Sequence, residues 1–276
     1  MPYNPELWTR YEFEQSPIYI RSDHPSWFVP NIKGESLLSS CSDEELPLRN
    51  KFLARLPDVS AVEYLGRHEY LQHDQLKELW LHITNRCNLS CHHCLFTSGP
   101  ASTAEMSAEL VLSRAAEAVA LGCRIFALTG GEPFFHPQFS EILGGLLAFP
   151  DCHVVILTNG LLLEQKLTDD FDLSRVHLQI SVDGLDDRHD AIRGQGTFVQ
   201  LRKQLPALRQ RGIPFTLSMC VERRNLEDMA ALVDFAVDVG ASNLHYLWYF
   251  IQGRGTDAGF VSPEEILVLL QKDCGS

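Results

Sequence analysis

The fold of this chain is constrained most by an alternation of apolar runs with helical segments. This alternation begins near residue 76. The helical segment 104–121 is rich in Ala, Glu and Leu and ends at Gly122, a favoured helix C-cap. A second helical segment, 225–239, ends at Gly240. The strand-like apolar runs lie near 78–84, 124–129, 153–158, 176–182, 214–221 and 243–250. Strands that alternate with helices in this way predict βαβ units and a parallel sheet.

These six runs predict an α/β fold, a partial (β/α)6 TIM-like barrel within residues 76–276. Successive runs are spaced by roughly 30 residues on average, which leaves room for one helix between strands. A full eight-stranded barrel typically takes about 250 residues, more than remain after residue 75. The barrel is therefore expected to be incomplete.

Three cysteines form the first motif, Cys87-x3-Cys91-x2-Cys94, which follows the apolar run 78–84. Fe–S clusters are held by cysteine thiolates, usually four of them. Three thiolates on one loop can hold three irons of a four-iron cluster, and the fourth iron is then open to a small molecule. The spacing therefore predicts a [4Fe–4S] cluster with one free coordination site.

Two other interpretations of these cysteines remain open. Zinc prefers four tetrahedral ligands, and His92 or His93 could complete a Cys3His set. Such a site would leave the motif Gly130-Gly131-Glu132-Pro133 unexplained. A disulfide framework is disfavoured, because residues 1–6 have neither the basic start nor the apolar core of a secretory signal.

Polar motifs also follow the later apolar runs. Gly130-Gly131-Glu132-Pro133 follows the second run, Asn159 the third, and Ser181-Val182-Asp183-Gly184 ends the fourth. In parallel α/β barrels, functional groups gather at the carboxyl ends of the strands. The cysteines and these three motifs are therefore expected to form one site at one face of the barrel.

The cysteine motif and Gly130-Gly131-Glu132-Pro133 together resemble the radical S-adenosylmethionine (SAM) superfamily, over roughly residues 76–260. The resemblance implies that the open iron binds the amino and carboxylate groups of SAM. It also implies that an electron from the cluster cleaves SAM to methionine and a 5′-deoxyadenosyl radical, which abstracts a substrate hydrogen. The chain is most similar to SPASM-type enzymes that modify peptides or proteins. A reductant such as ferredoxin or flavodoxin is implied as a partner.

Part of the SAM site is implied by the same resemblance. The turn Gly130-Gly131-Glu132-Pro133 is implied to bind the SAM amino group, through backbone carbonyls and the Glu132 carboxylate. His93 stands where the family usually has an aromatic residue whose backbone meets the adenine. Asn159, at the end of the third run, is expected to contact SAM or substrate.

The stretch that holds Ser181, Asp183 and Arg193 looks like the fourth-strand region of peptide-modifying members. Ser181 and Arg193 are implied to hold the SAM carboxylate, with Asp183 near the ribose. An arginine can bind a carboxylate through two parallel hydrogen bonds. A purely structural interpretation is that Ser181 and Asp183 cap the next helix while Arg193 pairs with Asp187 or Asp190. No residue is assigned to the steps after hydrogen abstraction.

Residues 1–75 have a different pattern. Segments 17–21 and 27–30 predict two short strands, and 31–38 begins a short helix. Apolar residues at every fourth position of 48–56 indicate a further helix. This order resembles a PqqD-like domain, a small α+β, winged-helix-like module that recognises peptides. An ordinary extension packed on the barrel is the other interpretation.

The net charge, and the lack of an apolar stretch long enough to span a membrane, argue against two classes of partner. The net charge of −13 disfavours nucleic acid, whose phosphates are bound by clustered Lys and Arg. No apolar run approaches the roughly 18 residues of a membrane span. With no secretory signal, we expect a cytoplasmic protein that has neither nucleic acid nor membrane as a partner.

The sequence thus favours a radical SAM enzyme that modifies a ribosomally made peptide or protein. The competing hypotheses are a radical SAM enzyme acting on a small molecule or tetrapyrrole precursor, a noncatalytic metal-binding protein, and a peptide-binding scaffold. We expect a peptide-recognition domain over 1–75 and a radical SAM core over 76–276. SPASM-type enzymes continue past the barrel into a cysteine-rich domain that holds auxiliary clusters, whereas residues 261–276 contain a single cysteine, Cys274. Either the core is a fragment or the enzyme lacks auxiliary clusters.

Overall fold

The chain folds into two compact units, Met1–Asp74 and Gln75–Ser276. The structure is a computed structural model, and it describes residues 5–13, 16–21, 26–40, 42–56, 75–168, 170–266 and 268. Across these ranges, no helix has both the length and the apolar character needed to cross a bilayer. Each unit is described by itself below.

The smaller unit is built on a three-stranded antiparallel sheet in the order β1-β2-β3. Its strands are β1 (Trp8–Phe13), β2 (Ser16–Arg21) and β3 (Trp27–Phe28). The second and third occupy the two segments expected to be strands, whereas the first was not expected. In β1 only Trp8 is buried, although Tyr11 and Phe13 alternate with Arg10 and Glu12 in the sequence, a strand pattern that was missed there.

Two helices follow this sheet, α1 (Ile32–Ser39) and α2 (Leu46–Leu53). The Asn31 side chain caps α1 by accepting a 2.8 Å hydrogen bond from the backbone N–H of Gly34. Pro47 lies in the first turn of α2, where a missing N–H costs no helical hydrogen bond. Both helices fall where the sequence predicts them, so the smaller unit has α+β character.

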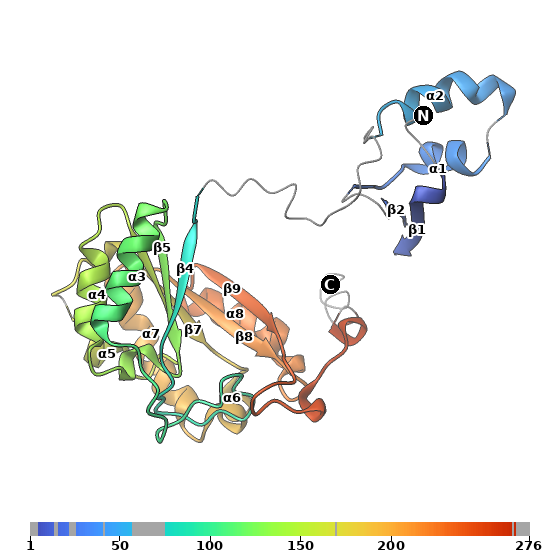
Figure 1. The fold of residues 1–276 in the computed structure, drawn as a ribbon. Coiled ribbons are helices and arrows are strands. Elements are labelled where there is room, and N and C mark those ends of the chain that lie inside the picture. The colour runs from blue at the N-terminus through green and yellow to red at the C-terminus, as the bar shows by residue number, and fades with distance from the viewer. Residues whose placement is uncertain are drawn as a thin grey trace. The chain divides into compact units, whose positions relative to one another are not determined.

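The larger unit contains a six-stranded sheet in the order β4-β5-β6-β7-β8-β9 (Figure 1). All neighbouring strands are parallel. The strands are β4 (Glu78–Thr84), β5 (Ile125–Gly130), β6 (His153–Thr158), β7 (Val176–Ser181), β8 (Phe215–Val221) and β9 (Asn243–Trp248). The six predicted runs coincide with these strands, which confirms the α/β class and the parallel sheet of a partial barrel.

Helices connect the strands. They are α3 (Ala108–Ala120), α4 (Phe139–Leu147), α5 (Leu163–Lys166), α6 (Asp186–Arg193), α7 (Thr197–Gln210) and α8 (Met229–Val239). Helix α3 begins four residues later than expected from the sequence, because the Ser107 hydroxyl caps it by accepting from the N–H of Leu110 at 3.2 Å. Figure 1 shows α3, α4 and α7 on the same side of the sheet.

The two faces of the sheet differ in what they contact. On β7, Val176, Leu178 and Ile180 belong to the hydrophobic core that the helices cover. Successive side chains of a strand point to opposite faces, so Ser181 lies on the other face. This second face, at the carboxyl ends of the strands, carries the polar side chains of the candidate site.

Candidate functional site

The cysteine loop, residues 85–99, directly follows β4 and carries the three cysteines. Cys87 is buried, and its sulfur accepts a hydrogen bond from the N–H of Leu89 at 3.4 Å. The Cys94 sulfur accepts from the N–H of Ser98 at 3.3 Å. Hydrogen bonds to cysteine sulfur help to set the reduction potential of an Fe–S cluster. The loop therefore supplies both sulfur donors and backbone groups that act on them.

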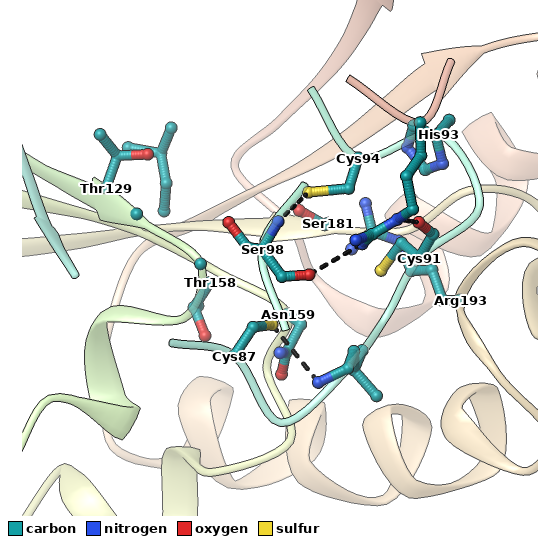
Figure 2. Close-up of a pocket in the computed structure, with 15 residues that line it drawn as sticks. Cys87, Cys91, His93, Cys94, Ser98, Thr129, Thr158, Asn159, Ser181 and Arg193 are labelled. Carbon is teal, nitrogen blue, oxygen red and sulfur yellow. Dashed lines mark hydrogen bonds between the residues drawn. The ribbon is translucent and has the colours of Figure 1, made fainter. Parts of the chain in front are cut away.

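One pocket gathers most of the predicted site residues (Figure 2). The predicted residues that line it are Cys87, Cys91, His93, Cys94, Gly130, Gly131, Asn159, Ser181 and Arg193. Glu132, Pro133 and Asp183 are buried and do not line it. The lining residues come from the ends of β4, β5, β6 and β7 and from α6, so segments far apart in the sequence converge as the strand-end argument predicts.

Gly130, at the end of β5, and Gly131 allow this segment to approach the end of β4 and the start of the cysteine loop. Gly131 N–H donates to the carbonyl of Thr84 at 2.7 Å, and Glu132 N–H donates to that of Arg86 at 2.9 Å. A Cβ on Gly131 would lie 2.3 Å from the Arg86 carbonyl oxygen, and one on Gly130 would lie 2.3 Å from that of Thr84. Only residues without a Cβ permit this approach.

The Glu132 carboxylate is fully buried behind this turn. It accepts hydrogen bonds from the Thr158 hydroxyl at 2.9 Å, from the N–H of Asn159 at 2.8 Å and from the N–H of Phe134 at 3.1 Å. Burial raises the pKa of this carboxyl to about 7 against the opposing effect of these donors. Glu132 thereby joins the turn after β5 to the end of β6.

A buried ion pair links the end of β7 to α6. Arg193 Nε donates to Asp183 Oδ2 at 2.6 Å, and Asp183 Oδ1 accepts from the N–H of Cys220 at 2.9 Å. His93 Nε2 lies 3.3 Å from the same Asp183 Oδ2. Burial alone would raise the pKa of Asp183, but the Arg193 charge and the hydrogen bond from the Cys220 N–H hold it below its ordinary value. Arg193 therefore pairs with Asp183, not with Asp187 or Asp190.

His93 is the predicted adenine contact, and its ring is almost completely enclosed. Burial lowers the pKa of the imidazole below its ordinary value, so the neutral form is favoured. With Nε2 toward Asp183, the Nδ1 atom is buried without a hydrogen-bond partner among the described residues. An unpartnered buried nitrogen in a lined pocket is a position where a bound molecule can supply the missing donor.

Asn159 joins the third strand to the cysteine loop. Its Nδ2 donates to Asn88 Oδ1 at 2.8 Å, and its Oδ1 accepts from the N–H of Leu161 at 3.1 Å. Asn159 therefore holds the cysteine loop in position as well as lining the pocket. Pocket residues to which the sequence assigned no role are Leu89, Ser98, Thr129, Leu157, Thr158 and Arg254. Of these, only Arg254 has a visible sequence signal, its two flanking glycines.

The histidines of the zinc hypothesis are engaged away from the three thiols. His92 Nε2 contacts Arg224 Nη2 at 2.6 Å, and His93 faces Asp183. Within the ranges that the structure describes, no three His, Cys, Asp or Glu side chains are grouped to hold a single metal ion. Cys123, Cys152 and Cys220 are free thiols, while Cys41 and Cys274 lie outside the described residues.

The protonation of the cysteines couples metal binding to pH. Burial raises the pKa of the Cys87 thiol to about 12, and burial also raises that of Cys91. A buried thiol keeps its proton until a cation replaces it, so metal binding here is coupled to proton release. The donor set of three sulfurs therefore fits a positively charged group of soft-ligand preference.

Comparison with known proteins identifies the family. The model of the radical SAM superfamily matches residues 81–236. The antilisterial bacteriocin subtilosin biosynthesis protein AlbA of Bacillus subtilis is 32% identical over 253 residues, which cover 88% of this chain and 53% of AlbA. The AdoMet-dependent heme synthase of Methanosarcina barkeri is 31% identical over 195 residues, 66% of this chain and 53% of the synthase. The chain thus spans about half the length of these curated relatives.

Solved structures share the fold. Streptococcus suis SuiB superposes with a TM-score of 0.60 at 15% identity, covering 98% of this chain and 67% of SuiB. SuiB bound to precursor peptide SuiA gives a TM-score of 0.62 at 13% identity, covering 97% of this chain and 69% of SuiB. The family match spans more than half of the chain and includes the cysteine loop and the turn after β5. The chain therefore belongs to the radical SAM superfamily, whose members use a [4Fe–4S] cluster and SAM.

Proposed function

We propose that this chain generates the radical in an enzyme that modifies a ribosomally made peptide or protein. The observation that carries the proposal is the convergence of three cysteine thiols with Gly130, Ser181 and Arg193 on one pocket. In this family the cluster and SAM together supply reductive cleavage of SAM and abstraction of a substrate hydrogen. A small electron-transfer protein such as ferredoxin or flavodoxin would supply the electron.

The residues of the pocket divide into two sets. Cys87, Cys91 and Cys94 would hold three irons; Cys87 is buried, and the other two are partly exposed to the pocket that they line. Gly130, Gly131, Glu132 and Pro133 would receive the amino group of SAM, and Ser181 with Arg193 its carboxylate. The Arg193–Asp183 contact supports this role, because it uses Nε and orients the planar guanidinium at the pocket wall.

Three smaller assignments complete the site. His93 would stand beside the adenine, where its buried Nδ1 has a free acceptor position. Asp183 would act near the ribose through the groups that it orients, since its own carboxylate is 0% exposed. Asn159 would position the cysteine loop against SAM through its hydrogen bond to Asn88.

A peptide substrate is favoured over a small molecule by the extent of the similarity. AlbA, a bacteriocin biosynthesis protein, matches 88% of this chain, whereas the heme synthase matches 66%. SuiB, which has been seen with a precursor peptide, shares the fold over 97% of the chain. Both peptide-related matches therefore extend into residues before 76, where the smaller unit lies.

The smaller unit would be a PqqD-like, winged-helix-like domain that captures the peptide. Strand β3 pairs with β2 along one side, and within the described ranges no other strand pairs with it. A peptide can add a strand to such an edge, taking affinity from main-chain hydrogen bonds and specificity from alternate side chains. Residues 1–75 would then bind the peptide while residues 76–276 carry the chemistry.

The test uses the whole chain with its cluster reconstituted without oxygen. We expect reduced protein to convert SAM to 5′-deoxyadenosine, and small peptides encoded beside the gene to bind in calorimetry and be altered in mass. Failure to cleave SAM with a full cluster would contradict the proposed activity. SAM cleavage coupled to a tetrapyrrole or nucleotide, with no peptide bound, would instead establish the small-molecule hypothesis.

A further inference from the structure

The segment that follows β9 reaches back to the cysteine loop. Arg254 Nε donates to the carbonyl of Cys91 at 2.7 Å, and Arg254 Nη2 donates to that of Ser98 at 2.9 Å. The backbone N–H of Arg254 donates to the carbonyl of Cys94 at 3.0 Å. One residue therefore binds the cysteine loop at three points, from more than 150 positions away along the chain.

The neighbouring glycine makes this contact sterically possible. Gly253 has a φ of +65°, and a Cβ there would lie 2.4 Å from the Cys94 carbonyl oxygen and 2.3 Å from that of Leu95. Neither distance is tolerated by a real Cβ, so a side chain at this position would push the two segments apart. The glycine thus permits the approach of Arg254 to the loop.

The positive charge of Arg254 strengthens its hydrogen bonds to the cysteine loop. Arginine remains protonated at all working pH values, and its planar fork donates in two fixed directions. Hydrogen bonds from a charged donor are roughly twice as strong as those between neutral groups. Arg254 also lines the same pocket as the three cysteines, so its positive charge lies on the side where thiolates would face iron.

We infer that Arg254 is a positioning residue for the cluster site, which fixes the backbone between Cys91 and Ser98 and places a permanent positive charge beside the bound cluster. This rests on the proposed function, because it presumes that Cys87, Cys91 and Cys94 hold a cluster. A reduced cluster carries one more negative charge than an oxidised one, and net charge and hydrogen bonding help to set its potential. Arg254 therefore favours the reduced form.

The test compares Arg254→Gln, Arg254→Lys and Arg223→Gln in the reconstituted whole chain. Arg223 is the matched control, because it pairs with Glu265 at 3.0 Å and loses the same charge. The readouts are iron content and a potential titration followed by electron paramagnetic resonance. In Arg254→Gln we expect the ratio of reduced to oxidised cluster at a fixed potential to fall about tenfold, which equals about 59 mV for one electron. Arg254→Lys keeps the charge but loses the fork, so its ratio should fall less than that of Arg254→Gln. In Arg223→Gln the ratio stays within about twofold, because its charge is exposed and screened.

Each outcome decides the inference. An unchanged ratio in Arg254→Gln, or an equal shift in Arg223→Gln, overturns it. If both Arg254 variants lose iron, thermal unfolding of the metal-free proteins is compared: equal unfolding supports positioning, and early unfolding overturns it in favour of a general structural role. Failure of the unaltered chain to bind a cluster would contradict the proposed function, whereas a normal cluster in all variants contradicts only the role of Arg254.

Discussion

Arg193 Nε lies 2.6 Å from Asp183 Oδ2, and both side chains are almost completely removed from solvent, with 12% and 0% exposure. Taking two charges out of water is costly, and the attraction within a buried pair offsets that cost only when other hydrogen bonds also satisfy the ions. Asp183 meets this condition through the N–H of Cys220. The pair therefore fixes the guanidinium at the wall of the pocket, where a second carboxylate could meet its remaining donors.

Replacing Arg193 should lower both the stability of the fold and the affinity for SAM. Arg193→Ala leaves Asp183 buried without its partner, a loss that typically costs about 3–5 kcal/mol in the free energy of unfolding. It would also remove the charge-assisted hydrogen bond that we propose Arg193 makes to SAM, so affinity should fall roughly tenfold to a hundredfold. Urea unfolding and calorimetry with SAM measure the two effects.

The double variant Arg193→Ala, Asp183→Asn is the control for that experiment. Asparagine is neutral and can still accept from the Cys220 N–H, so most of the lost stability should return. SAM affinity should stay low, because the guanidinium is still absent. Recovery of both properties together would mean that Arg193 acts on stability alone.

Removal of the three thiols should remove the cluster. We expect the triple variant Cys87→Ala, Cys91→Ala, Cys94→Ala to lose iron and its visible absorbance after anaerobic reconstitution, since the cluster is held by cysteine thiolates. Cys123→Ala is the matched control, because Cys123 is also a buried free thiol but belongs to the hydrophobic core. Full iron in the triple variant would contradict the assignment of the ligands.

The Glu132 carboxyl should make stability depend on pH. Its pKa is about 7 in the folded chain and 4.5 in the unfolded chain, so folding takes up a proton between these values. The contribution is fully present below pH 4.5 and is lost as pH rises through about 7, by about 3 kcal/mol in total. Relative to Glu132→Gln, unfolding of the metal-free protein in urea should show this loss between pH 4.5 and 7.5.

Glu265→Gln provides a control of the opposite sign. The hydrogen bond from Arg223 lowers the pKa of Glu265 to about 2, so that carboxyl is ionised in both states across most of this window. Its contribution is lost only as pH falls below about 4.5, and the comparison with unaltered protein should be flat above it. A flat result for Glu132→Gln as well would mean that its carboxyl does not titrate near neutral pH.

The approach of the segment after β9 predicts a steric effect at Gly253. Gly253→Ala should lower iron incorporation, because its Cβ would overlap the carbonyls of Cys94 and Leu95. Gly212 has the same φ of +65° but no atom within 4 Å of its Cβ position. Gly212→Ala therefore reports backbone strain alone, about 1 kcal/mol, and should keep full iron. Equal iron content in the two variants would contradict close packing at Gly253.

Local sequence patterns were sufficient to predict the six barrel strands and the cysteine loop. The six barrel strands are buried apolar runs between helical segments, and the cysteines lie on one short loop, so both are visible in neighbouring residues. The start of α3 was expected four residues early because Ser107, a capping residue, follows helix-favouring residues outside the helix.

Side-chain contacts between distant parts of the chain could not be predicted from the sequence. The contacts of the Asp183 carboxylate with Arg193, His93 and the N–H of Cys220 were not predicted. Arg254 meets Cys91 across 163 positions of the chain. The sequence predicts that the strand ends gather at one face, but it does not predict which side chains pair there.

Protein groups brace the cysteine loop at many points. Asn159, Arg224 and Arg254 contact it through side chains, and the turn after β5 contacts its start through the backbone. Ordering a free backbone residue costs about 1–2 kcal/mol in conformational entropy, and each of these protein contacts offsets part of that cost without involving a cysteine sulfur. The geometry of the loop is therefore shared between its cysteines and residues distant in the sequence, so exchanging the loop alone with that of a relative should fail to transfer its properties.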